Sequence, residues 1–150
     1  APVVVPLNRD HRPDLADEAA RIMRAGSMVT YYQLPLSGGR VYRIENSMAV
    51  CRALGDWKWK PPHKQHYVIT NQSECSHFPL GDQSRFLILA CDGLWETLSN
   101  EEAVQIANKC LGQGDSCSPQ TLKAAANAIV QAALEKKSTD NITAMVIGLH

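Results

Sequence analysis

A continuous apolar run from Phe86 to Cys91 constrains the fold of this chain more than any other segment. The run is too short for a helix and polar residues bound it, which is typical of a central strand buried on both faces. A second apolar and β-rich run, from Ile142 to Leu149, predicts another strand. An aspartate stands at one end of each run, because Asp92 follows the first and Asp140 precedes the second.

Two helices are predicted between these strands. Residues Ser99 to Glu102 have the S-x-x-E pattern of a capping box, and apolar residues follow at helical spacing. Ser118 and Pro119 offer a second helix start, with proline at the first helical position. The order strand, helix, helix, strand should bring the strand ends together around Asp92 and Asp140.

The first half of the chain has a different pattern. A short amphipathic helix is predicted from Asp14 to Arg24, with a left-handed glycine cap two residues later. Strands and hairpins are predicted from Met28 to Arg52, around the turn signal Ser37-Gly38-Gly39. The segment from Trp57 to Leu80 is irregular apart from a strand-like stretch at Tyr67 to Thr70, so we expect a loop-rich region.

Composition narrows the class of protein. Among the 150 residues, fifteen Lys and Arg balance fifteen Asp and Glu, so we expect no nucleic acid and no membrane surface as partners. The longest apolar run is far shorter than the roughly 20 residues of a membrane span. The five cysteines lack zinc or disulfide spacing, which favours a reducing compartment and an intracellular protein, cytoplasmic or nuclear: Cys51, Cys75, Cys91, Cys110 and Cys117.

Asp92 and Asp140 can be interpreted in two ways. A carboxylate at the end of a buried strand is costly unless it is hydrogen-bonded, paired or bound to a metal. Mg²⁺ and Mn²⁺ prefer oxygen ligands, so two converging aspartates would make half of a metal site. Alternatively, Asp before Gly and Asp-Asn before a strand are common turns that satisfy their own backbone.

Five motifs occur in one order along nearly the whole chain. They are Leu7-Asn8-Arg9-Asp10-His11-Arg12-Pro13, Glu18-Ala19-Ala20-Arg21-Ile22, Arg52-Ala53-Leu54-Gly55-Asp56, Phe86-Leu87-Ile88-Leu89-Ala90-Cys91-Asp92-Gly93-Leu94-Trp95 and Ser138-Thr139-Asp140-Asn141-Ile142-Thr143. In this order and spacing the chain resembles the metal-dependent protein serine/threonine phosphatases of the PP2C family.

The resemblance implies a fold and a reaction. The fold would be α+β, an antiparallel β-sandwich flanked by helices, with residues 1–150 forming only the carboxyl-terminal part and residues 57–80 a flap-like loop region. In this family two or more Mg²⁺ or Mn²⁺ ions activate a water that attacks the phosphorus of phosphoserine or phosphothreonine. The expected partner is therefore a phosphoprotein substrate.

The resemblance also assigns site residues. Asp92 and Asp140 resemble the two metal-ligating aspartates of the family's second half. Glu96 replaces an aspartate that in some members helps to hold an additional metal, and Asn141 is expected to fix the Asp140 turn through its side chain. No residue of this chain is assigned as the general acid.

Other motif residues are expected to be structural. Gly93 would allow a tight turn beside the metals, and Trp95 would pack in the core. Asp56 is expected to hold a turn near the site, and Arg52 to pair with a carboxylate.

The family's D-G-H-G motif and its early acidic residues do not occur in this sequence. We therefore expect the chain to need an amino-terminal half, without which the two apolar strands would be left as exposed edges. Two alternatives stay open: a catalytically inactive phosphatase-like binding or regulatory module, and a purely structural α/β domain.

Overall fold

A computed structural model describes residues 3–34, 39–112 and 118–149 of the chain. Their contacts divide the chain into two units, Asn8–Ser76 and Ala1–Leu7 with His77–His150. Each unit has its own hydrophobic core. The prediction that residues 1–150 belong to one phosphatase domain stays a prediction, because these units report only contacts within this chain.

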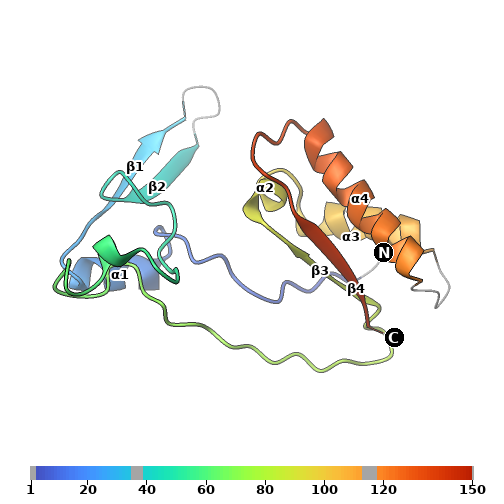
Figure 1. Cartoon of the computed structure of the whole chain (residues 1–150), viewed down its shortest axis with the longest axis horizontal. Helices are drawn as coiled ribbons and strands as arrows, with labels where there is room; N and C mark the ends of the chain where they lie inside the picture. Colours follow the sequence, from blue (N-terminus) through green and yellow to red (C-terminus); the bar gives the residue numbers. More distant parts are fainter. Residues whose placement is uncertain (1–2, 35–38, 113–117, 150) are drawn as a thin grey trace. The chain divides into compact units, whose positions relative to one another are not determined.

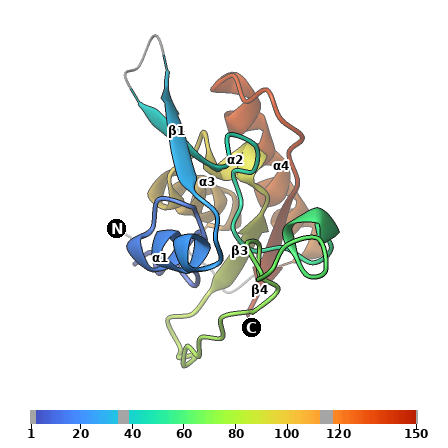
Figure 2. The same cartoon turned by 90° about the vertical axis from the view of Figure 1, so that its left-hand side faces the viewer.

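The described residues of the unit Asn8–Ser76 include the α-helix α1 and a β-hairpin (Figures 1 and 2). Helix α1 is Ala16–Arg24, and Gly26 follows it with a φ of 78°, as the predicted left-handed cap requires. Strands β1 (Val29–Gln33) and β2 (Arg40–Ile44) pair antiparallel, with Tyr31 opposite Tyr42. Ser37 and Gly38 of the predicted turn lie outside the described residues. The core of this unit is a small buried cluster: Ile22, Ile44, Cys51, Trp59, Val68 and Ile69.

One strand prediction in this unit is wrong, whereas the hairpin predicted between Met28 and Arg52 forms as β1 and β2. Among the described residues, Tyr67 to Thr70 joins no strand and forms a single isolated bridge, between Arg52 and Thr70. The backbone N–H groups of Val68 and Ile69 donate instead to the carbonyl of Trp59, at the end of the 3₁₀ turn η1 (Trp57–Trp59). The described residues after β2, from Glu45 to Arg52, form turns and two isolated bridges, at Met48 and Arg52. Burial, and not pairing, explains the apolar composition here.

The other unit is built on strands β3 (Phe86–Ala90) and β4 (Ala144–Gly148), which pair antiparallel (Figure 1). Helices α3 (Asn100–Leu111) and α4 (Pro119–Glu135) pack against each other, and α4 packs against β4. A helical turn that the sequence analysis missed, α2 (Asp92–Trp95), follows β3 directly. The core of this unit lies between the ribbon and the helices: Leu94, Leu98, Ala103, Ala107, Leu111, Ala125, Ile129, Ala133 and Val146.

The predicted helix starts are confirmed. The Ser99 hydroxyl accepts a hydrogen bond from the Glu102 backbone N–H, and the Glu102 carboxylate accepts one from the Ser99 N–H, which completes the capping box. Ser118 accepts a hydrogen bond from the N–H of Thr121, with Pro119 in the first helical position. Within the described ranges, every helix is too short or too polar to cross a membrane.

The prediction that β3 is buried on both faces is wrong for this chain. Phe86, Ile88 and Ala90 pack against the core, and alternation along the strand places Leu87 and Leu89 on the opposite face. The register sets these two opposite Ile147 and Met145, so the outer face of the ribbon is apolar. The side chains of Leu89 and Met145 are 50% and 56% exposed. The helices cover one face only.

Candidate functional site

The two aspartate-bearing segments meet where the β3–β4 ladder ends. Ala90 and Ala144 form the last pair of the ladder, and the Cys91 N–H donates to the Thr143 carbonyl at 3.1 Å. Asp92 comes directly after this point on one side. Asp140 comes shortly before it on the other. The predicted convergence of the strand ends is confirmed.

Gly93 marks the closest approach of the two segments. A Cβ atom at this position would lie 2.2 Å from the backbone oxygen of Asn141 and 3.3 Å from the Cβ of Asp140. Only a residue without a side chain fits such a gap. The Asp92 turn and the Asp140 loop therefore lie in direct contact.

Gly93→Ala should destabilise the protein by about 1–3 kcal/mol, because the added methyl overpacks against backbone that cannot rotate away. The midpoint of urea unfolding measures this change. Gly81→Ala is the matched control, since a Cβ at Gly81 meets nothing within 4 Å. Equal stability of the two variants would contradict the close approach.

The carboxylates of Asp92 and Asp140 share one geometry. Asp92 Oδ1 accepts a hydrogen bond from the Gly93 N–H at 3.0 Å, and Asp140 Oδ1 accepts one from the Asn141 N–H at 2.7 Å. Both residues are exposed. The turn interpretation is thus right for one oxygen of each carboxylate, and it leaves the other oxygen available to a ligand.

The donor set fits part of a Mg²⁺ or Mn²⁺ site. Both side chains are oxygen donors, and no ion pair of the described residues involves either of them. The described residues contain no group of three or more His, Cys, Asp or Glu side chains arranged to hold a metal. Two aspartates alone would be an incomplete ligand set.

Glu96 and Asn141 lie beside the two aspartates. Glu96 is exposed at the end of α2, and its N–H donates to the Asp92 carbonyl at 2.8 Å. The Asp140 turn is closed by the Asp140 carboxylate and the backbone N–H of Asn141, whereas we expected the Asn141 side chain to do this. Trp95 packs against the core as predicted and donates its Nε1–H to the Ala90 carbonyl at 3.0 Å.

Asp56 belongs to the other unit, Asn8–Ser76. It precedes η1 in a left-handed conformation with a φ of 49°, and its carbonyl accepts a hydrogen bond from the Trp59 N–H at 3.0 Å. Asp56 therefore lies in a turn, as predicted. Its predicted proximity to the metal site stays a prediction.

This unit also contains a buried carboxylate, Glu18, that was not predicted from the sequence. Glu18 is only 2% exposed and pairs with the guanidinium groups of Arg21 and Arg52. Arg52 also contacts Glu74 at 3.1 Å, and Glu74 contacts Arg9 at 2.7 Å. The predicted pairing of Arg52 with a carboxylate is confirmed. The E-x-x-R spacing was the available signal, since it places Glu18 and Arg21 on one helix face.

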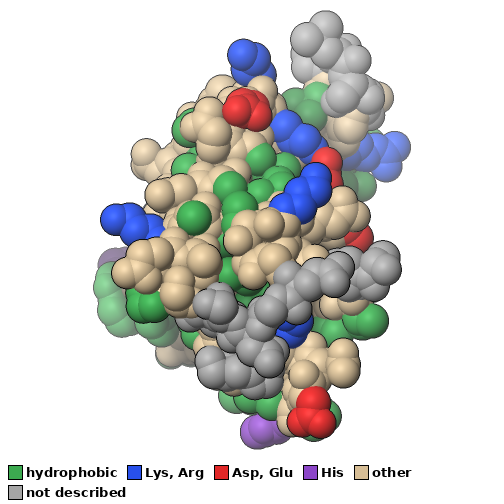
Figure 3. Space-filling model, turned by 90° about the vertical axis from the view of Figure 1, so that its right-hand side faces the viewer, with side chains coloured by type: hydrophobic (Ala, Val, Ile, Leu, Met, Phe, Trp, Pro, Cys, Tyr) green, Lys and Arg blue, Asp and Glu red, His purple; other side chains and the backbone are tan. Residues whose placement is uncertain are grey.

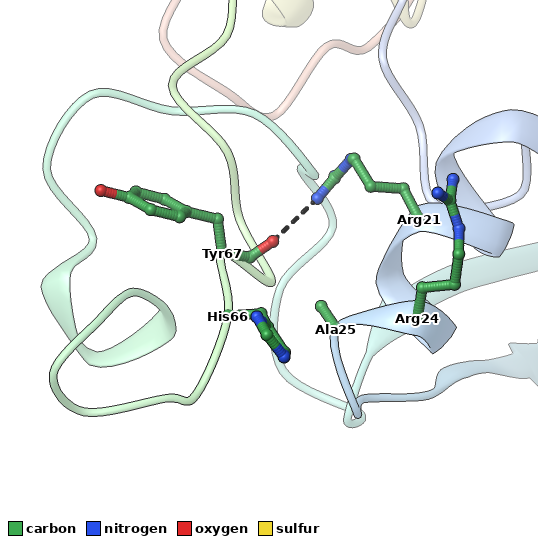
Figure 4. A pocket seen from close by; sticks show the side chains of 5 residues that line it. All are labelled: Arg21, Arg24, Ala25, His66 and Tyr67. Carbon is green, nitrogen blue, oxygen red and sulfur yellow. Dashed lines mark hydrogen bonds between the residues drawn. The ribbon is translucent and has the colours of Figure 1, made fainter.

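A hollow at the end of α1 is lined by Arg21, Arg24, Ala25, His66 and Tyr67 (Figure 4). The guanidinium group of Arg21 already has hydrogen-bond partners within the protein. It donates to the backbone carbonyls of Tyr67, Val68 and Cys51 and to the Glu18 carboxylate. The hollow is therefore best explained as a by-product of the packing around this arginine.

Figure 3 shows the distribution of charge on one face of the molecule. Basic, acidic and hydrophobic side chains are all visible in this view. The balanced composition of the sequence is thus reflected on this face by mixed charge.

Comparison with known proteins places the chain in a family. A model of the family described as "Protein phosphatase 2C" matches residues 2–142. Probable protein phosphatase 2C 8 of Oryza sativa subsp. japonica is 37% identical over 154 residues, which cover 99% of this chain and 35% of the relative. Protein phosphatase 2C 37 of Arabidopsis thaliana is 37% identical over 153 residues, with the same shares covered.

The chain is also similar to solved structures. A serine-threonine phosphatase 2C from Toxoplasma gondii superposes with a TM-score of 0.69 at 28% identity, over 95% of this chain and 46% of that one. A sex determining protein of C. elegans gives a TM-score of 0.74 at 25% identity, over 96% and 32%.

The structural matches define an α+β phosphatase domain, of which this chain is a part, so the predicted fold class is confirmed. The chain belongs to the protein phosphatase 2C family, whose members are serine/threonine protein phosphatases and in general depend on metal ions. It spans about a third of the length of the curated relatives that it matches.

Proposed function

We propose that the complete protein dephosphorylates phosphoserine and phosphothreonine in proteins, using water activated by Mg²⁺ or Mn²⁺. The observation that carries this proposal is the contact of the Asp92 turn with the Asp140 loop at Gly93. It brings two exposed carboxylates to one end of the β3–β4 ribbon, in the order that the family's motifs require.

Asp92 and Asp140 would hold the metal through the carboxylate oxygens that the turn hydrogen bonds leave available. When bound, the ions supply charge stabilisation at the phosphoryl group and lower the pKa of water. The protein then contributes mainly positioning, since phosphoryl transfer needs little covalent chemistry from side chains. The exposed Glu96 carboxylate, one helical turn after Asp92, is a candidate additional ligand.

We infer that an amino-terminal half completes both the site and the sheet. Two aspartates leave the ligand set short, and the matched relatives are nearly three times as long as the matched region. The outer face of the β3–β4 ribbon also supports this inference. Leu87, Leu89, Met145 and Ile147 give it the apolar surface that a second layer would cover.

An intracellular location is part of the proposal. Of the cysteines that the structure describes, Cys51, Cys75, Cys91 and Cys110 are all free thiols. Cys75 and Cys110 are exposed, and free thiols on a protein surface are typical of a reducing compartment.

The test uses the complete protein and a phosphothreonine peptide. We expect hydrolysis with Mn²⁺ or Mg²⁺ and its loss in EDTA, with recovery when Mn²⁺ is added back. The 150-residue chain alone should bind Mn²⁺ weakly and show no turnover. Full turnover in EDTA would overturn the metal-dependent mechanism. If the complete protein does not bind Mn²⁺ and does not release phosphate, the result would support an inactive regulatory module instead.

A further inference from the structure

Side chains hold the Asp92 turn and the Asp140 loop together beyond the end of the backbone ladder. The Cys91 thiol donates to the Asn141 carbonyl at 3.2 Å and accepts from the Thr143 N–H at 3.2 Å. The Ser138 hydroxyl donates to the Gly93 carbonyl at 2.6 Å. We call Cys91, Gly93 and Ser138 the strand-end clamp.

The clamp lies directly beside both aspartates in sequence and in space. Cys91 and Gly93 flank Asp92. Ser138 is two residues before Asp140, and Cys91 contacts the residue that follows it. Each contact therefore joins a side chain near one aspartate to the backbone near the other.

We propose that Cys91 and Ser138 are positioning residues that fix the spacing of Asp92 and Asp140, and with it the affinity of the site for metal. This inference rests on the proposed function of the two aspartates. The inferred role of Cys91 and Ser138 is not that of metal ligands. The polar atom of each side chain already contacts backbone of the opposite segment.

The physical reason is the shape of the strand ends. Beyond Cys91 the β3–β4 ladder has ended, so its hydrogen bonds no longer keep these two segments of the chain together. Ligands need support that holds them to within about 0.5 Å of the productive geometry. Groups that orient metal ligands affect metal affinity by about 10–100-fold when they are removed. The thiol and the hydroxyl are the side-chain groups that cross this gap among the described residues.

The experiment measures Mn²⁺ binding to the complete protein by the loss of the free-ion electron paramagnetic resonance signal. Cys91→Ala and Ser138→Ala should each raise the dissociation constant for Mn²⁺ about 10-fold. The melting temperature of the metal-free protein should fall by only a few degrees, because each variant loses weak or single hydrogen bonds at a half-buried position. Ser138→Thr, which keeps the hydroxyl, should retain most of the affinity.

Two controls separate this role from general destabilisation. Ser99→Ala removes the α3 cap in the same unit and should lower the melting temperature without changing Mn²⁺ affinity. Cys110→Ala removes an exposed thiol and should change neither quantity.

The outcomes also separate this inference from the proposed function. Wild-type Mn²⁺ affinity in Cys91→Ala and Ser138→Ala, together with lost binding in Asp92→Asn, would overturn the positioning role alone. Unchanged Mn²⁺ binding in Asp92→Asn and Asp140→Asn would overturn the metal site itself.

Discussion

Asp92→Asn in the complete protein should lower the rate of Mn²⁺-dependent phosphopeptide hydrolysis about 10³-fold, and Asp140→Asn should do the same. Loss of a metal ligand removes several kcal/mol of transition-state stabilisation, and each 1.36 kcal/mol is a factor of ten in rate. Asparagine retains an oxygen that can accept the hydrogen bond from the Gly93 or Asn141 N–H. The turn should therefore survive while the charge is lost.

The control for this prediction is Asp56→Asn. Asp56 holds its turn through its backbone carbonyl, so the change should cost less than about tenfold in rate. Steady-state kinetics at saturating Mn²⁺, with circular dichroism to check folding, make the comparison. Equal losses for Asp56, Asp92 and Asp140 would contradict the different roles given to them.

Glu18→Ala should lower the free energy of unfolding by about 3 kcal/mol, because removing one partner of a buried ion pair leaves charge without compensation. The Glu18 carboxylate is almost fully buried and accepts hydrogen bonds from both Arg21 and Arg52. Its loss would leave these two guanidinium groups without the carboxylate that pairs with both. Urea unfolding of the complete protein measures the effect.

We expect the stability of the folded protein to depend on pH through the same carboxylate. Burial raises the pKa of Glu18, but hydrogen bonds from Arg52 and Arg21 outweigh it and bring the pKa below the ordinary 4.5. Hydrogen bonds from Arg9 similarly lower the pKa of Glu74 to about 2. The unfolded chain then binds more protons, so this stabilisation is full above about pH 4.5 and is lost as the pH falls below it.

Asp17→Ala serves as the control for Glu18→Ala. Asp17 is on the same helix and pairs with Arg9 at 2.5 Å, but it is exposed, so its removal should have a much smaller effect. In Glu18→Ala the acid limb of the stability curve should flatten. An unchanged acid limb would show that Glu18 does not titrate as described.

The elements set by local signals were predictable from the sequence. The capping box at Ser99 and the Ser-Pro start of α4 depend on residues within one turn, and both form as expected. The meeting of Asp92 with Asp140 was also predictable, because two helices between antiparallel strands return the chain to the same end of the ribbon.

Which distant residue a given side chain would contact was not predictable from the sequence. Glu18 and Arg52 are 34 residues apart, so nothing local marks their pairing. The apolar run of β3 indicates a strand that tolerates burial on both faces, but it does not say what covers each face. The thiol of Cys91 gave no signal either, since its contacts depend on how the two strands diverge at the end of the ladder.

The pairing of β3 with β4 also sets the order in which the site can form. More than fifty residues separate the middles of the two strands, and α3 and α4 occupy about half of that interval. Closing so long a loop costs entropy until the helices fold and shorten the distance between its ends. We therefore expect helices α3 and α4 to pack before Asp140 comes into contact with the Asp92 turn. Substitutions that loosen the packing of Ala125 or Ile129 would delay assembly of the site without touching either carboxylate.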